Sequence, residues 1–364
     1  MQNSWNLPLH KLSESDKKRV STVWDLSHLC YEQNLFGQVT ALAYSNNGGI
    51  LGCTSSNQIA LVRVPQSEGV LVNTQTERKN FSLHFRDDDK LYVQAVDQRV
   101  IVKSTETAFE RVFSGHTRDV HSVLFLGRHN FVSASDDTSV KLWDLLSDAE
   151  LETGRVHTDY VRCLDNYTSG CFFSGSYDHH VNLWDPRAGL SAPISHTKDA
   201  LTAGVECLHF IRKENILSCG SGDQIFLFDM RKGLTTPLSQ ASLHTKSVVS
   251  LAYSEKYNTL ISSALDNRVK MLVLDGGEIH CINTKKFDDP VTCVSLHPES
   301  KEFAVGCTSG ALKVFKLKEN TPTSEQQALE EAGLVERKLT KDEILQKKWA
   351  PSSKTFLLFN TEKR

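Results

Sequence analysis

The sequence predicts an all-β fold, a seven-bladed β-propeller, on two observations. A set of polar and aromatic residues recurs at intervals of 40 to 44 residues. Within each interval, short runs of β-branched and apolar residues alternate with turn-forming residues, as in strands joined by tight loops. Self-similarity at this period is typical of repeat architectures. We therefore interpret the 364 residues as one large repeat array with short flanking segments rather than as two unrelated domains.

Two stretches carry the repeat most clearly. Residues 133–144 and 174–185 both end in Leu-Trp-Asp, and Trp143 and Trp184 are 41 residues apart. Each tryptophan follows a histidine by 27 positions, a serine by ten and an aspartate by six. The complete sets are His116, Ser133, Asp137 and Trp143, and His157, Ser174, Asp178 and Trp184. A third set, His244, Ser262 and Asp266, lacks the tryptophan. The serines eight positions before each tryptophan, Ser135 and Ser176, are alternative members.

Positions equivalent to the two tryptophans indicate the number of blades. They are Val62, Lys103, Trp143, Trp184, Phe228, Leu272 and Phe315, spaced by 41, 40, 41, 44, 44 and 43 residues. Seven such positions predict seven blades. We expect the propeller to span residues 28–317, between an N-terminal extension (1–27) and a C-terminal tail (318–364).

The third unit shows how one blade is built. Residues 120–125, 130–135 and 140–144 are β-branched or apolar runs, separated by turn residues such as Gly127 and Asp136. These runs are nearly continuous rather than alternating because a propeller blade packs against a neighbour on each face. The spacing predicts three strands, with a fourth, outer strand after Asp144, and leaves no room for helices.

Closure of the ring is predicted from the N-terminal end of the array. An open blade would expose an unpaired edge strand. Residues 28–35 precede Phe36-Gly37 as residues 108–113 precede Ser114-Gly115. They therefore occupy the position of an outer strand that has no blade of its own. We expect this segment to pair with the blade that ends near Phe315.

The tail is predicted to be partly helical. Ser324-Glu-Gln-Gln327 and Thr340-Lys-Asp-Glu343 resemble capping boxes, which start helices. We expect two short helices at residues 325–332 and 341–348. From Lys318 onward the tail has nine basic and eight acidic residues, so it is not a basic arm for RNA.

Composition narrows the classes of protein. Lys plus Arg is 41 and Asp plus Glu is 44, a net charge of −3, which excludes a globally basic nucleic-acid binder. No apolar run approaches the length of a membrane span, and residues 1–12 lack the apolar stretch of a signal peptide. The nine cysteines are widely spaced and never form C-x-x-C. Buried, reduced thiols of an intracellular protein are the expected state.

The recurring Ser, His and Asp also suggest a hydrolase, because these residues form catalytic triads. A hydrolase needs one such set in one cleft, whereas here whole sets recur from blade to blade. We therefore expect a structural role. His179 and His180 are adjacent in a predicted turn with no further ligand cluster, which argues against a metal. The sequence predicts no enzyme activity, no cofactor, no metal and no small-molecule substrate, and it favours protein binding.

Residues at the starts of the inner strands are expected to line one rim of the disk and to form a protein-binding surface. Arginine and tyrosine are enriched at interface hot spots. The candidates are Arg118, His121, Tyr160, Arg162 and Ser247, with Tyr177 on a nearby turn.

The repeats resemble WD40 repeats, which begin near Gly115-His116 and end in Trp143-Asp144. That resemblance implies that the His, Asp, Ser and Trp of a blade form a buried hydrogen-bonded tetrad. Several stretches also resemble the family of U-three small-nucleolar-RNA-associated protein fifteen. They are residues 53–59, 81–86, 113–123, 157–163, 174–181, 244–251 and 304–310, with Tyr160-Val161-Arg162 and Ser176-Tyr177-Asp178-His179 the most specific.

The second resemblance implies a scaffold role in the small-subunit processome and in 18S rRNA maturation, in the nucleus and nucleolus. The implied partners are other WD40 propeller subunits, with any contact to pre-ribosomal RNA indirect. Members of that family continue into a sizeable helical domain, whereas this chain has only residues 318–364 after the propeller.

An alternative rests on two blade endings. Trp184-Asp-Pro-Arg187 and Phe228-Asp-Met-Arg231 resemble the endings of propellers that act as substrate receptors of cullin-four ubiquitin ligases. In those proteins the arginine reaches an adaptor, so Arg187 and Arg231 are further candidate contact residues. Ordinary turn chemistry, in another WD40 scaffold, also explains them.

Overall fold

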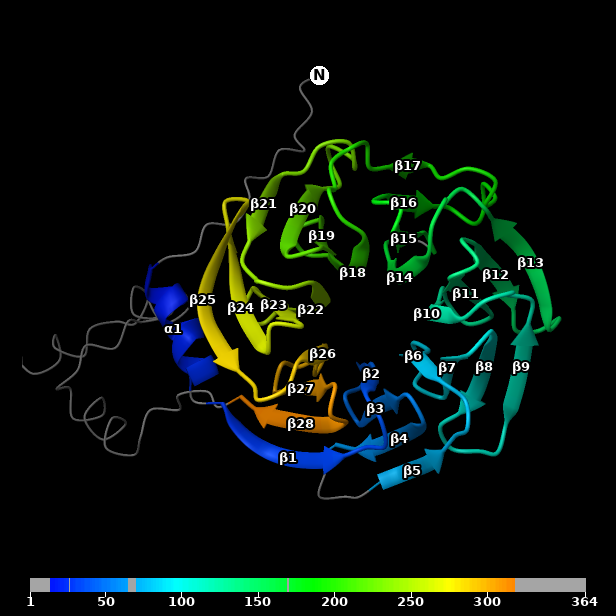
Figure 1. Ribbon diagram of the computed structural model, residues 1–364, viewed down its shortest axis with the longest axis horizontal. Coiled ribbons are helices and arrows are strands. Elements are labelled where there is room, and N and C mark those ends of the chain that lie inside the picture. The colour runs from blue at the N-terminus through cyan, green and yellow to red at the C-terminus, as the bar shows by residue number, and fades with distance from the viewer. Residues whose placement is uncertain (1–13, 26, 65–69, 169, 318–364) are drawn as a thin grey trace, which may run out of the picture. The chain divides into compact units, whose positions relative to one another are not determined.

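The computed structural model describes residues 14–25, 27–64, 70–168 and 170–317. These residues form seven four-stranded antiparallel sheets, arranged as blades around a central axis (Figure 1). The predicted seven-bladed, all-β propeller is confirmed. In each blade the first strand lies nearest the axis and the fourth lies at the circumference.

The first and second strands have five to seven residues in every blade, whereas the outer strands range from two to nine residues. The innermost strands are β2 (Val39–Tyr44), β6 (Asn80–Phe85), β10 (Val120–Phe125), β14 (Val161–Asn166), β18 (Val205–Ile211), β22 (Val248–Ser254) and β26 (Val291–Leu296). The second strands are β3 (Ile50–Ser55), β7 (Leu91–Val96), β11 (Asn130–Ser135), β15 (Phe172–Ser176), β19 (Ile216–Ser221), β23 (Thr259–Ala264) and β27 (Glu302–Cys307). The third strands are β4 (Gln58–Arg63), β8 (Arg99–Ser104), β12 (Val140–Asp144), β16 (Val181–Trp184), β20 (Gln224–Asp229), β24 (Arg268–Asp275) and β28 (Ala311–Lys316). The outer strands are β5 (Val70–Gln75), β9 (Glu110–Ser114), β13 (Ala149–Gly154), β17 (Ser195–His196), β21 (Ser239–Ser242), β25 (Glu278–Lys286) and β1 (His28–Asn34).

The recurring aromatic position of the sequence lies on the third strand of every blade. Trp143 on β12 stacks on Phe131 of β11, with ring centroids 6.2 Å apart, and Trp184 on β16 stacks on Phe172 of β15 at 6.3 Å. Both indoles are buried against the facing blade. The second strands are buried along almost their whole length, because each blade packs against a neighbour on both faces. This burial explains why their sequences do not alternate.

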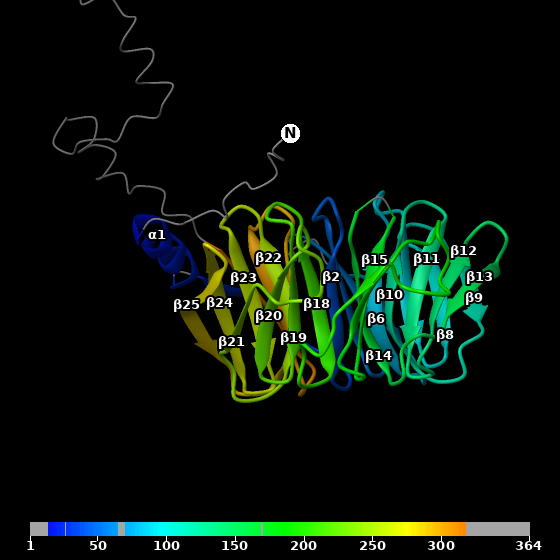
Figure 2. The same cartoon turned by 90° about the horizontal axis from the view of Figure 1, so that it is seen from above.

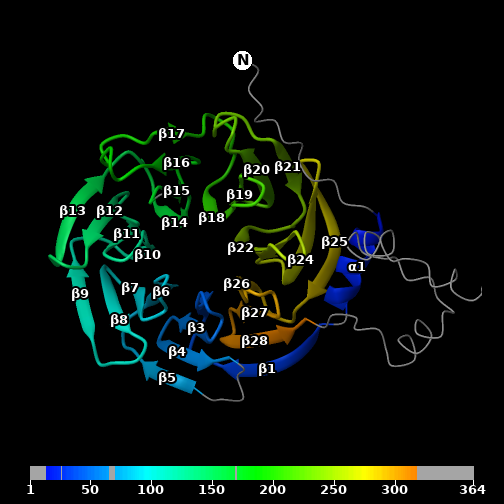
Figure 3. The same ribbon diagram turned by 180° about the vertical axis from the view of Figure 1, so that it is seen from behind.

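The ring closes as the sequence predicts. Strand β1 pairs antiparallel with β28, from His28 opposite Lys316 to Asn34 opposite Ala311. The N-terminal end of the array thus supplies the fourth strand of the blade formed by its C-terminal end (Figure 3). Closure leaves no unpaired β28 edge for other chains to extend.

A helix that the sequence did not predict precedes β1. Helix α1 (Glu14–Asp25) packs beside β25. Val23 and Trp24 are buried in the apolar cluster that contains Phe303. Lys17 Nζ lies 2.8 Å from an oxygen of Asp275 at the end of β24. Residues 1–27 are therefore more than an extension, because this part of them covers the seam next to the closing blade.

Three further predictions concern the tail, the cysteines and membrane spans. The predicted helices at 325–332 and 341–348 lie outside the described residues. All nine cysteines are free thiols, seven of them buried, with Cys30 and Cys281 exposed. Among the described residues, no helix has the length and apolarity that a membrane crossing would need.

A candidate protein-docking site at the mouth of the central channel

One irregularity is shared by all seven innermost strands. In each, the pairing register shifts around the second residue, which is left without a partner on the second strand. Such a β-bulge re-aims one side chain. The seven bulged residues, named here the bulge ring, are Thr40, Phe81, His121, Arg162, Glu206, Val249 and Thr292. All are half-buried, and five of them line the central channel, which has a volume of about 470 Å³.

The channel mouth opens on one face of the disk, here called the upper face. This face carries the loops that lead from the outer strand of one blade to the innermost strand of the next. Figure 2 shows the disk edge-on, with the loops between strands gathered along its two faces. Since the strands of a blade alternate in direction, the turns between second and third strands lie on this face too. The bulge ring follows directly after those connecting loops.

The structure brings the recurring His, Asp, Ser and Trp together below the upper face. In the third blade His116 Nδ1 lies 2.8 Å from Asp137 Oδ2, and His116 Nε2 lies 2.7 Å from Ser133 Oγ. The indole N–H of Trp143 donates to Ser133 Oγ at 2.8 Å. The fourth blade repeats this arrangement with His157, Ser174, Asp178 and Trp184.

The sixth blade has the first three members only. His244 lies 3.0 Å from Asp266 and 2.9 Å from Ser262, and Leu272 replaces the tryptophan. The serine is the one ten positions before the aromatic residue in each case. Ser135 and Ser176, the alternatives, instead donate to carbonyls of the preceding loop.

These sets are built for structure rather than for catalysis. Ser133, Ser174 and Ser262 are each 0% exposed, so no substrate reaches their hydroxyls. Burial opposes ionisation of Asp137, yet hydrogen bonds from His116 and Ser139 hold the pKa of its carboxyl below the usual range. A buried polar group with all partners in place fixes one loop conformation. Each set thereby anchors an upper-face loop to its blade.

The rim candidates of the third and fourth blades form one cluster above those anchors. The guanidinium of Arg162 lies 4.9 Å from the ring centroid of Tyr177 and 5.4 Å from that of Tyr160. The guanidinium of Arg118 also lies over the ring of Tyr160, 6.0 Å from its centroid. Cation–π contacts of this kind hold flexible arginines in a defined position. The structure therefore places four predicted residues side by side, on two neighbouring blades.

His121 joins the cluster through Asp136, a residue that the sequence interpretation did not single out. His121 Nε2 lies 3.0 Å from Asp136 Oδ2, and Arg162 donates to His121 Nδ1 at 2.9 Å. Arg162 Nε is also 3.4 Å from Asp136 Oδ1. Burial and the Arg162 charge lower the pKa of His121. The imidazole is therefore neutral near pH 7 and accepts from the arginine.

Two further members were missed. The ring of Phe81 packs against that of His121 in a tilted orientation, with centroids 4.4 Å apart, and Glu206 accepts a hydrogen bond from the hydroxyl of Tyr177. Phe81 and Glu206 are the missed members, and both belong to the bulge ring. The sequence could have indicated them by their position directly after a connecting loop, but the repeats carry different residue types at that position. With them the network spans four consecutive blades, whereas Val249, Thr292 and Thr40 leave the other side of the mouth uncharged.

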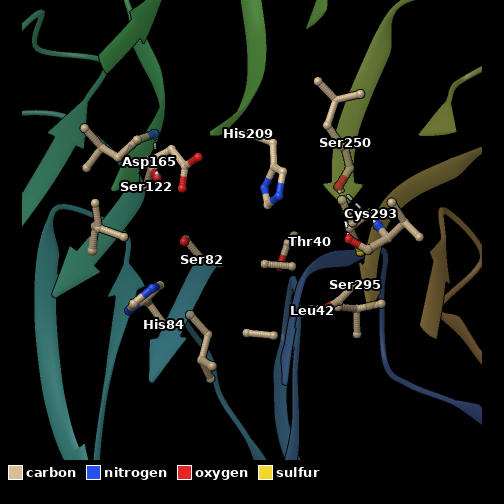
Figure 4. A pocket seen from close by; sticks show the side chains of 18 of the residues that line it. Thr40, Leu42, Ser82, His84, Ser122, Asp165, His209, Ser250, Cys293 and Ser295 are labelled. Atoms are coloured by element: carbon tan, nitrogen blue, oxygen red, sulfur yellow. Dashed lines mark hydrogen bonds between the residues drawn. The ribbon is translucent and has the colours of Figure 1, made fainter. Parts of the chain in front are cut away.

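Several polar side chains inside the channel accept hydrogen bonds from backbone N–H groups on the innermost strand of the next blade. Ser122 accepts the N–H of Leu164 at 3.2 Å, and Asp165 accepts that of Phe210, each on the next blade. Asp165 and His209 reach into the channel from neighbouring blades (Figure 4). Burial raises the pKa of Asp165 and lowers that of His84 to about 4. No group of three or more metal-binding side chains occurs in the described part of the chain.

Arg187 and Arg231 lie away from this cluster, because the third strands end on the opposite face. Each bonds the aspartate two residues before it, Arg187 with Asp185 at 2.8 Å and Arg231 with Asp229 at 2.8 Å. The side chain of Arg187 is 70% exposed. Both arginines therefore stabilise the turn that follows their third strand, and most of the Arg187 side chain remains exposed to solvent.

The fold and the anchored loops define a WD40-repeat β-propeller. The family model described as "WD domain, G-beta repeat" matches residues 108–144, 150–185 and 279–316. The first two segments contain the complete tetrads, and the third covers the closing blade.

Comparison with individual proteins gives a more specific similarity than the repeat type alone. The chain is 28% identical over 286 residues to U3 small nucleolar RNA-associated protein 15 homolog of Xenopus tropicalis, covering 77% of this chain and 54% of that protein. It is 29% identical over 236 residues to U3 small nucleolar RNA-associated protein 15 of Schizosaccharomyces pombe, covering 64% and 47%. For the Saccharomyces cerevisiae protein of that name the values are 26% over 298 residues, 75% and 56%. The chain spans about half the length of the curated relatives it matches.

Proposed function

We propose that this chain is a non-catalytic scaffold of the small-subunit processome, in which it docks other proteins during assembly and pre-18S rRNA processing. The similarity to U3 small nucleolar RNA-associated protein 15 supports the setting, since it extends over 77% of the chain. The nucleolus would then be its location. A tetrad-anchored propeller with serines inaccessible to substrate supports the non-catalytic role.

The observation that carries the docking role is the cluster at the channel mouth. The guanidinium of Arg162 lies over the rings of Tyr160 and Tyr177, and all three side chains are half-buried before any partner binds. Pre-positioned aromatic and arginine side chains lose little conformational freedom on binding, which favours their use as hot spots. The partners expected are other proteins, including other WD40 propellers, with any contact to pre-ribosomal RNA made through them.

Depletion of the protein tests the setting. If the chain works in small-subunit assembly, its loss leads to accumulation of 18S rRNA precursors and a fall in mature 18S relative to 28S rRNA. Re-expression of the wild-type chain restores the ratio. Unchanged precursor levels after depletion would refute the assembly role.

A substrate receptor of a cullin-four ubiquitin ligase is the second candidate. Its support is the pair of Arg–Asp turns at equivalent positions of the fourth and fifth blades. Recovery of an adaptor and a cullin with the wild-type chain, and their loss with Arg187→Ala plus Arg231→Ala, would establish this function instead.

A further inference from the structure

A second cavity lies beside the channel mouth on the upper face. It occupies about 290 Å³ between the fourth and fifth blades. Its lining residues come from the upper-face loops and the adjoining strand ends of three neighbouring blades: Asp159, Tyr177, His179, Ala203, Gly204, Glu206, Gly222 and Ser247. Arginine and lysine are absent from this lining. The cavity, here called the side pocket, shares Tyr177 and Glu206 with the docking cluster.

The side pocket is kept open by small residues. A Cβ atom on Gly204 would lie 2.8 Å from the Tyr177 ring, closer than real Cβ contacts allow. Gly222 has a φ of +57°, a conformation that glycine adopts without strain. Gly204 therefore lets the backbone press flat against Tyr177 and fixes that ring as a wall. Ala203 and Gly222 also line the side pocket, and a Cβ atom on Gly222 would lie only 3.0 Å from that of Ala203.

Two carboxylates in the side pocket lack a cation. Asp159 accepts the N–H of Tyr160 at 2.7 Å through Oδ1, and Glu206 accepts the hydroxyl of Tyr177 through Oε1. Within the described residues neither forms an ion pair. Arg162, which lies over the ring of Tyr177, is instead paired with Asp136. Two half-buried carboxylates that line one cavity and have no paired cation in the described part of the chain attract a positively charged group.

We propose that the side pocket binds a lysine or arginine side chain of a partner protein docked at the channel mouth. This inference rests on the proposed docking function and names the chemistry of its partner. A basic side chain places its alkyl stem against the Tyr177 wall and the glycine floor, and its charged head between Asp159 and Glu206. Partner recognition would then combine the preformed Arg–Tyr cluster with a pocket of opposite charge.

Binding of single amino-acid probes to the isotope-labelled full chain tests the side pocket directly. The probes are Nα-acetyl-lysine amide and Nα-acetyl-arginine amide, each compared with an uncharged twin, the Nε-acetylated lysine and the citrulline derivative. NMR titration should show saturable shifts centred on Asp159, Gly204, Glu206 and Gly222 for the charged probes. The uncharged twins should bind about tenfold more weakly or not at all, because a charge-assisted hydrogen bond is lost.

Three variants complete the test. Glu206→Gln and Asp159→Asn should each weaken the charged probes several-fold, and Ser247→Lys should abolish their binding by supplying a tethered ammonium group. Thermal unfolding identifies which variants keep the wild-type fold, and those are compared. Glu278→Gln, which removes a carboxylate that is 79% exposed on β25, is the matched control and should leave binding unchanged.

Equal binding of charged and uncharged probes, shifts centred outside the side pocket, or unchanged binding in all folded variants would overturn the proposal. The outcome is independent of the assembly role. Probe binding with normal 18S rRNA after depletion would keep the pocket and reject the processome setting. Abnormal 18S rRNA without probe binding would do the reverse.

Discussion

The indole N–H of Trp184 donates to the hydroxyl of Ser174 at 2.8 Å, across two neighbouring strands of the fourth blade. That hydroxyl in turn lies 2.7 Å from His157, whose other nitrogen lies 2.8 Å from Asp178. Four residues from a loop, a turn and two strands thus form one buried chain of hydrogen bonds. The upper-face loop that carries Tyr160 is held in place by this chain.

Removal of the indole should destabilise the fold strongly. We expect Trp184→Ala to lower the free energy of unfolding by about 3–5 kcal/mol, because it leaves a cavity and deprives Ser174 of its donor. Chemical denaturation measures the change. Leu146→Ala is the control, since Leu146 is 70% exposed and its loss should have almost no effect. Equal stability of the Trp184→Ala variant and wild type would contradict the tetrad's structural role.

His84 should make stability depend on pH. Burial lowers the pKa of His84 from its ordinary value near 6.5 to about 4, against the opposing charge of Asp87. The unfolded chain therefore binds a proton at a higher pH than the folded chain, so the stability due to neutral His84 is present above pH 6.5 and is lost as pH falls towards 4. The expected loss is about 2 kcal/mol between pH 7 and pH 4.5.

Urea denaturation across this pH range, on wild type and His84→Gln, measures that contribution as the difference between two slopes. The variant should lose stability less steeply on acidification. His196→Gln, at an exposed histidine on β17, should keep the wild-type slope. Identical slopes for wild type and His84→Gln would contradict the assignment.

Ring closure by β1 predicts the effect of truncation. Deletion of residues 1–34 removes α1 and β1, exposes the edge of β28 and should lower Tm by several degrees and promote self-association. Deletion of residues 1–12 leaves both elements and serves as the control. Light scattering and thermal unfolding would compare them. A monomeric 1–34 deletion with unchanged Tm would show that β1 is dispensable for closure.

The repeat made most of the fold predictable. Strands β10, β11 and β12 begin and end where the sequence predicts, because β-branched runs and turn residues agree in every unit. The closing strand was found by comparing Phe36-Gly37 with Ser114-Gly115. Helix α1 was not found, since it has no repeat to support it. Its signal in the sequence is weak, since the described apolar contacts of the helix come from Val23 and Trp24 in an otherwise polar segment.

The sequence predicted the docking cluster less completely than it predicted the fold, and the reason is physical. The tetrad residues follow the repeat because each blade uses them in the same way. The docking cluster depends on what differs between blades. Glu206 and Phe81 occupy a position that holds six different residue types in the seven blades. The β-bulge that these positions share with His121 and Arg162 is the structural feature that relates them, and it is visible only in the strand pairing.

Affinity purification of the full chain from cells, read by mass spectrometry and RNA sequencing, tests the docking role most directly. The comparison is between wild type, Arg162→Ala and the control Lys213→Ala, which removes a lysine from a loop of the opposite face. We expect wild type and Lys213→Ala to recover other processome propellers and pre-ribosomal RNA, and Arg162→Ala to lose at least one protein partner while keeping its fold. Recovery of the same partners by all three chains, or of no processome component by wild type, would contradict docking at the channel mouth.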